Sequence, residues 1–100
     1  MRIVWSPLAL ERVQETARYI ADDNPDAALR WVDNLFAAVE RLAEFPESGR
    51  IVPEVGSPRI RELISGAYRV IYGLSNQIDI LTVRHSSQLL RLSELCEHET

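Results

Sequence analysis

The chain has 100 residues, of which 46% are hydrophobic, and this length and composition indicate one globular domain, residues 1–100. Its formal net charge of −4 argues against a general nucleic-acid-binding protein, because such proteins gain most of their affinity by neutralising phosphates. No apolar run approaches the roughly 20 residues that span a bilayer. The N-terminus also lacks a signal-peptide pattern, so we expect a cytoplasmic protein without direct membrane contact.

The first predicted elements are a strand and a helix. Residues 2–5 form a short apolar run with two β-branched residues, which predicts a strand. Ser6 suits the N-cap of a helix, and Pro7 suits the first helical position, where its missing N–H costs nothing. An apolar stripe at helical spacing follows, and it predicts a helix over residues 7–22: Leu10, Val13, Ala17 and Ile20.

A second helix is predicted over residues 25–44. Asn24 and Pro25 repeat the cap-and-proline device, and Pro46 stops the helix because the residue before a proline is pushed out of the α region. Its apolar stripe consists of Ala28, Val32, Leu35, Val39 and Leu42. The connection is too short for anything except antiparallel neighbours, so the two helices should form a hairpin.

Residues 47–58 are rich in glycine and proline, which predicts a loop. Residues 59–85 come next and contain three runs of β-forming residues. Two turn signals, Ser65-Gly66 and Gly73 to Asn76, separate the runs and predict a three-stranded antiparallel meander. Apolar residues occupy both odd and even positions of the second and third runs, and successive side chains of a strand point to opposite faces. We therefore expect both faces of the sheet to be covered. Two helices followed by clustered strands indicate the α+β class.

The C-terminal residues predict a short helix from Ser86 or Ser87, with Leu89, Leu90 and Leu92 as its apolar side. We expect an acidic, disordered tail over about residues 94–100. The single cysteine, Cys96, lies in this tail and cannot form an internal disulfide.

The sequence offers no pattern for a metal or a cofactor, and we expect neither. His85 and His98 lack the spacing of a zinc site, and we found no glycine-rich phosphate loop.

Six residues in the meander could carry chemistry or bind a partner: Arg61, Tyr68, Arg69, Tyr72, Arg84 and His85. Residues 50–93 hold six arginines and three acids, a local net charge of +3 that suits an anionic or acidic partner. Alternation places Tyr68 and Tyr72 on one face and Arg69 on the other. We favour an internal pairing of Arg69 with a carboxylate such as Glu62. For His85, a structural role and proton transfer both remain open.

Several segments together resemble the RelE/ParE superfamily of toxins over about residues 1–88. The segments occur in order along the chain and comprise Trp5-Ser6-Pro7 with Ala9, Tyr19-Ile20-Ala21, Asn24-Pro25 with Ala27-Ala28, Leu42-Ala43 with Phe45-Pro46 and Gly49-Arg50, Ile60 to Leu63, Tyr68 to Tyr72, and Ile80 to His85. The two motifs in the helix hairpin, YIA and NPxAA, look more like the ParE branch, whose members are often labelled plasmid-stabilisation proteins.

The resemblance implies a fold and a partner. The fold has the order β-α-α-β-β-β, with a helix hairpin on one face of an antiparallel four-stranded sheet of order 1-4-3-2. The chain would be the toxin of a type II toxin–antitoxin module, neutralised by a ParD-like antitoxin that lies along the hairpin and the sheet. Nucleic acid would then be contacted only through the antitoxin. We expect four partner-binding residues: Arg61, Arg69, Tyr68 and Trp31.

The resemblance leaves two targets open, and the composition favours one of them. The RelE branch cuts mRNA on the ribosome, whereas the ParE branch poisons DNA gyrase. The chain has no lysine, although a nuclease needs concentrated positive charge around its phosphate. We therefore expect a gyrase inhibitor without catalytic residues. The first alternative is a ribosome-dependent mRNA endonuclease that uses Arg61, Arg84, His85 and Tyr72. The second is a non-catalytic protein that only binds its partner.

Overall fold

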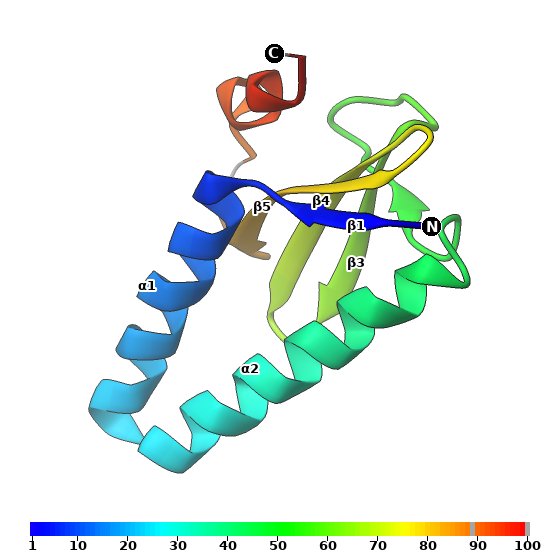
Figure 1. Cartoon of the computed structure of the whole chain (residues 1–100). Helices are drawn as coiled ribbons and strands as arrows, with labels where there is room; N and C mark the ends of the chain where they lie inside the picture. Colours follow the sequence, from blue (N-terminus) through cyan, green and yellow to red (C-terminus); the bar gives the residue numbers. More distant parts are fainter. Residues whose placement is uncertain (89, 100) are drawn as a thin grey trace.

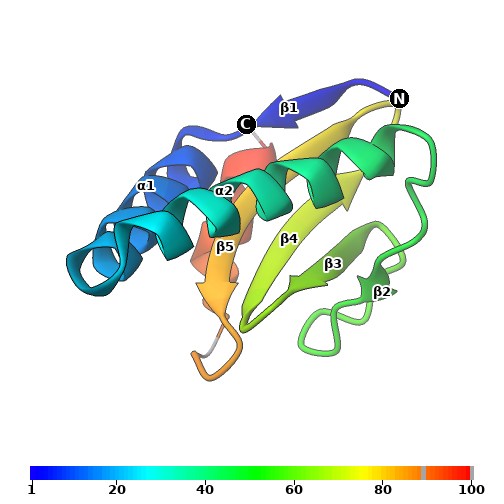
Figure 2. The same ribbon diagram turned by 90° about the horizontal axis from the view of Figure 1, so that it is seen from below.

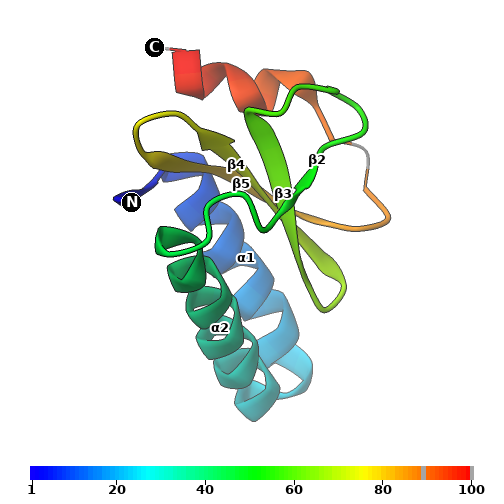
Figure 3. The ribbon, with the colours of Figure 1, turned by 90° about the vertical axis from the view of Figure 1, so that its right-hand side faces the viewer.

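A computed structural model describes residues 1–88 and 90–99 of the chain. A hairpin of two helices covers one face of a five-stranded mixed sheet, and a short C-terminal helix lies on the other face (Figures 1 and 3). The α+β class and the helix hairpin are therefore as predicted. Within the described residues, no helix combines the length and apolar character needed to cross a bilayer.

The N-terminal half follows the predicted elements closely. Strand β1 spans Ile3–Trp5, helix α1 Pro7–Asp23 and helix α2 Pro25–Glu40, and a 3-10 turn, η1, continues α2 over Arg41–Ala43. Both caps form, because Ser6 Oγ accepts the Ala9 N–H at 3.0 Å and Asn24 Oδ1 accepts the Ala27 N–H at 3.1 Å. The two cap-and-proline signals thus set the starts of both helices.

The sheet contains the predicted meander and one further strand. The strands are β2 over Arg50–Ile51, β3 over Ile60–Ser65, β4 over Tyr68–Leu74 and β5 over Ile78–His85, in the order β1-β5-β4-β3-β2. Strand β1 lies beside the last strand of the meander, as the resemblance implies (Figure 2). The prediction of four strands was wrong, because β2 pairs with Arg61 and Glu62 at the outer edge of β3.

The prediction of a wholly antiparallel sheet was also wrong, because β1 runs parallel to β5. The helix hairpin explains this direction: α1 leads away from the end of β1, and α2 returns to its start. The Met1 ammonium group donates to the Ala43 carbonyl at 2.7 Å, so the end of η1 lies beside the start of β1. The meander therefore starts at the end of the sheet where β1 begins. Because its three strands alternate in direction, β5 runs in the same direction as β3 and as β1.

Apolar residues cover the sheet on both faces, as predicted. The main core joins the hairpin to the sheet, and its fully buried members include Leu35, Val39, Val70, Tyr72 and Ile80. The second core lies under the C-terminal segment and contains Val52, Ile71, Leu81 and Leu90. Tyr72 pairs with Ile80 and Ile71 with Thr82, so Leu81 is an extra residue of a β-bulge and joins the second core.

The C-terminal segment differs from its prediction. Ser86 and Ser87 form a turn, and a 3-10 helix, η2, occupies Leu92–Glu99. Glu94 is buried and accepts a hydrogen bond from Thr82 Oγ1 at 2.9 Å, so the predicted disordered tail does not begin at residue 94. Leu89, predicted on the apolar side of this helix, lies outside the described residues, as do the side chains of Cys96 and His98. Disorder further along stays a prediction.

A substitution at Gly49 would show how tightly the loop before β2 packs on the sheet. A Cβ at this position would lie 2.5 Å from Tyr72 Oη and 2.7 Å from the Glu62 carbonyl oxygen. We therefore expect Gly49→Ala to lower the free energy of unfolding by about 2 kcal/mol, as in other overpacked sites. Urea denaturation measures the loss. The exposed neighbour Ser48→Ala is the control and should stay within about 0.5 kcal/mol of the unmodified chain. An equal effect of the two substitutions would contradict the close packing.

Candidate functional site

Arg61 and Tyr72 face each other in register at one end of the sheet, where they hold the loop before β2. Arg61 Nε donates to the Pro58 carbonyl at 2.9 Å, and its Nη1 donates to the Gly49 carbonyl at 3.0 Å. Tyr72 Oη donates to the Pro46 carbonyl at 2.8 Å and accepts the Gly49 N–H at 3.0 Å. Burial raises the pKa of Tyr72 above its ordinary value of 10.0. At neutral pH this hydroxyl is protonated and cannot serve as a base.

A second polar cluster lies on the opposite face and surrounds the fully buried carboxylate of Glu62. Arg50 Nε and Arg69 Nε both donate to this carboxylate, which confirms the predicted internal pairing of Arg69 with Glu62. Arg69 also donates two hydrogen bonds to Glu54, at 2.9 and 3.0 Å. The Glu54 contact raises the pKa of Arg69, and the same contact lowers the pKa of Glu54 below 4.5. Arg69 is therefore committed to internal contacts.

Three of the other predicted residues form an aromatic line from α2 to the end of β5. The ring centroids of Trp31 and Tyr68 are 5.2 Å apart, and those of Tyr68 and His85 are also 5.2 Å apart, both edge to face. His85 Nδ1 lies 2.7 Å from Ser87 Oγ and accepts the Ser87 N–H at 3.1 Å. Because a backbone amide only donates, the neutral His85 ring carries its proton on Nε2.

Arg84 lies next to His85 in sequence, but alternation places it on the other face of β5. Its Nη1 is 3.6 Å from Glu94 Oε2, and Arg12 Nη2 approaches the other Glu94 oxygen at 3.6 Å. Arg12 and Glu94 were not among the site residues predicted from the sequence. In the sequence, Arg12 belongs to the polar side of the first helix and Glu94 to an acidic tail. No local sequence pattern therefore indicates that the two residues meet.

The structure separates the four residues named for the nuclease alternative. Arg61 pairs with Tyr72 at one end of β4, and His85 pairs with Tyr68 at the other. The two pairs are four positions apart along β4, roughly 13 Å at the usual rise per residue. Arg84 and His85, by contrast, line the same cavity. The four side chains therefore do not surround one phosphate.

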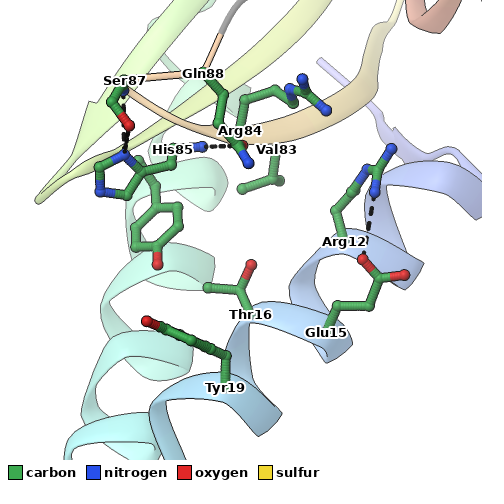
Figure 4. Close-up of a pocket in the computed structure, with 10 residues that line it drawn as sticks. Arg12, Glu15, Thr16, Tyr19, Val83, Arg84, His85, Ser87 and Gln88 are labelled. Carbon is green, nitrogen blue, oxygen red and sulfur yellow. Dashed lines mark hydrogen bonds and ion pairs between the residues drawn. The ribbon is translucent and has the colours of Figure 1, made fainter.

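A cavity of about 400 Å³ opens between α1 and the end of β5 (Figure 4). Its walls include Tyr19 and Arg12 from α1 and Tyr68, Val83 and His85 from the sheet. Neither Arg61 nor Tyr72 lines it. In the part of the chain that the structure describes, no three His, Cys, Asp or Glu side chains are grouped to hold a metal ion.

The pair between Glu54 and Arg69 predicts an acid-dependent loss of stability. The folded-state pKa of Glu54 is depressed, so its stabilising effect is present above about 4.5 and is lost as the pH falls through the folded-state value. Glu54→Gln should remove this dependence and cost under about 1 kcal/mol at pH 7, because Glu54 is partly exposed. Thermal unfolding between pH 7 and pH 3 measures the effect.

The control for this prediction is Glu11→Gln, at an exposed position on α1. It should leave the pH profile of the melting temperature close to that of the unmodified chain. If Glu54→Gln loses stability with acid as steeply as the unmodified chain, the contact does not carry the effect.

A family model and two relatives of similar length to this chain point to one group. A family model described as the ParE toxin of the type II toxin–antitoxin system parDE matches residues 3–90. Y4kP of Sinorhizobium fredii, a protein named as a toxin, is 42% identical over 87 residues, which cover 87% of this chain and 90% of the relative. Toxin RelE2 of Caulobacter vibrioides is 32% identical over 90 residues, covering 88% of this chain and 98% of that protein.

A solved structure shares the fold. The structure titled as a chromosomal ParDE toxin–antitoxin system from P. aeruginosa superposes with a TM-score of 0.69 at 20% sequence identity. The superposition covers 85% of this chain and 95% of that chain, so the likeness extends over the helix hairpin and the sheet together.

Proposed function

Because the chain belongs to the ParE toxin family of type II toxin–antitoxin systems, we propose that it inhibits growth through DNA gyrase and that a ParD-like antitoxin neutralises it. The observation that carries the choice of gyrase is the separation of Arg61 and Tyr72 from Arg84 and His85. A gyrase inhibitor of this kind acts in the cytoplasm and needs a binding surface, not a catalytic centre.

The contacts of the candidate residues argue against phosphoryl chemistry. Cleavage of mRNA requires cations gathered at one phosphate and a group that takes a proton from the nucleophile. Arg61 donates to backbone carbonyls, and Arg69 donates to two carboxylates. Tyr72 keeps its proton at neutral pH. Arg61 and Arg69 therefore stabilise the fold, and neither of them is available to a phosphate beside His85.

One observation keeps the mRNA endonuclease as a second candidate. His85 is partly exposed beside the cavity, with one ring nitrogen held by Ser87. The similarity to a protein named toxin RelE2 points in the same direction. A nuclease of this kind would have to use His85 without Arg61 or Tyr72.

Exposed apolar residues supply a surface for the antitoxin. Tyr19 is 76% and Leu29 67% exposed on the helix hairpin, and Ile64 is 54% exposed on β3. No described strand pairs with the outer edge of β3 beyond Glu62, so Ile64 lies on an open sheet edge. These positions fit a partner that lies along the hairpin and the sheet.

His85→Gln separates the two target classes. In a gyrase supercoiling assay, we expect the variant to inhibit within about threefold of the unmodified toxin, because His85 then has only a structural role. Proton transfer by His85 would instead make the substitution cost on the order of 100-fold in cleavage rate. The same preparations are tested on programmed ribosomes, and added antitoxin should restore supercoiling. Codon-specific mRNA cleavage that disappears in His85→Gln, with gyrase unaffected, would replace the gyrase proposal.

A further inference from the structure

Arg12 of α1 has hydrogen-bonding capacity that the fold does not use. A guanidinium group offers five N–H donors. The Nε of Arg12 is buried without a hydrogen-bond partner, and its Nη2 lies 3.6 Å from Glu94, beyond normal hydrogen-bond length. Its Nη1 donates a hydrogen bond to Glu15 at 3.3 Å. Arg61 and Arg69, which the sequence suggested for pairing with partner acids, by contrast each donate three hydrogen bonds to internal acceptors.

The present partner of Arg12 is easily replaced. Glu15 is 48% exposed and lies three residues along the same helix, and exposed pairs of this kind contribute little to stability. Glu94 behaves differently, because it is buried and also accepts from Thr82. The buried Glu94 therefore directs the Arg12 guanidinium, while the contact with Glu15 can be exchanged for a carboxylate that arrives from solvent.

The cavity beside Arg12 has room and chemistry for such a carboxylate. Its volume of about 400 Å³ holds more than one side chain. Figure 4 shows Thr16 and Tyr19 of α1 opposite Val83, His85 and the turn that follows β5. Both walls thus mix aromatic side chains with polar or charged ones. An acidic side chain flanked by apolar ones fits this lining.

We propose that this cavity receives an acidic side chain of the antitoxin, which replaces Glu15 on Arg12, while neighbouring apolar residues of the same segment pack on Tyr19 and Tyr68. The proposal rests on the toxin–antitoxin pairing proposed above. Arg12 and Arg84 both line the cavity, and among the described residues Glu15 is its one acidic lining residue, so the charge of the cavity suits an incoming carboxylate. The aromatic walls likewise favour a peptide over an inorganic anion.

Two substitutions test the charge and the space separately. The full-length toxin and its co-encoded ParD-like antitoxin are purified, and calorimetry measures their dissociation constant. Arg12→Gln removes the cation and should weaken binding at least tenfold. Thr16→Phe fills the cavity without touching an ion pair and should weaken binding by a similar factor. Glu15→Gln removes the competing carboxylate and should leave binding equal or up to threefold tighter.

Arg18→Gln is the matched control, because Arg18 is exposed on the same helix but does not line the cavity. It should bind within twofold of the unmodified toxin. Melting temperatures of the free variants identify any loss of folding. If Arg12→Gln is unstable, the binding constant of Thr16→Phe decides whether the antitoxin occupies the cavity. Binding within twofold for every variant would overturn the cavity assignment and leave the toxin–antitoxin pairing intact. No binding by the unmodified toxin would overturn the pairing itself, and the cavity assignment with it.

Discussion

The buried carboxylate of Glu62 is the constraint on which the outer half of the sheet depends. A buried charge without partners costs several kcal/mol, so the fold must bring cations to it. Arg50 arrives from β2 and Arg69 from β4, and Arg69 in turn binds Glu54 in the loop between β2 and β3. One carboxylate thereby joins two neighbouring strands to its own and orders the loop that separates β2 from β3.

The same network shapes the chemistry of the sheet. Arg50 and Arg69 already meet Glu62, Arg69 also meets Glu54, and Arg84 lies near Glu94. Glu54 and Glu62 are already counted in the local net charge of +3 for residues 50–93, and including Glu94 lowers it from +3 to +2. A fold that satisfies its own arginines in this way suits recognition of protein surfaces through shape and apolar contact better than attack on RNA.

The cavity beside α1 follows from how β5 is covered. Strand β1 pairs only with the first residues of β5, from Ile78 to Ile80. Beyond them α1 lies along the strand, beginning where Ser6 donates to the Ile80 carbonyl from its backbone and to the Leu81 carbonyl from its side chain. A helix cannot follow a strand edge as closely as another strand does, so side chains leave a space at the far end of β5.

Local signals in the sequence determined the α+β class, the two helix starts, the meander and the pairing of Arg69 with Glu62. Caps, prolines and alternation act within a few residues, so they can be read without a structure. Only the tertiary structure decided the parallel direction of β1, the strand β2, the separation of Arg61 from His85 and the meeting of Arg12 with Glu94. These features depend on contacts between residues far apart in the chain, such as positions 12 and 94, and no local propensity encodes such distances.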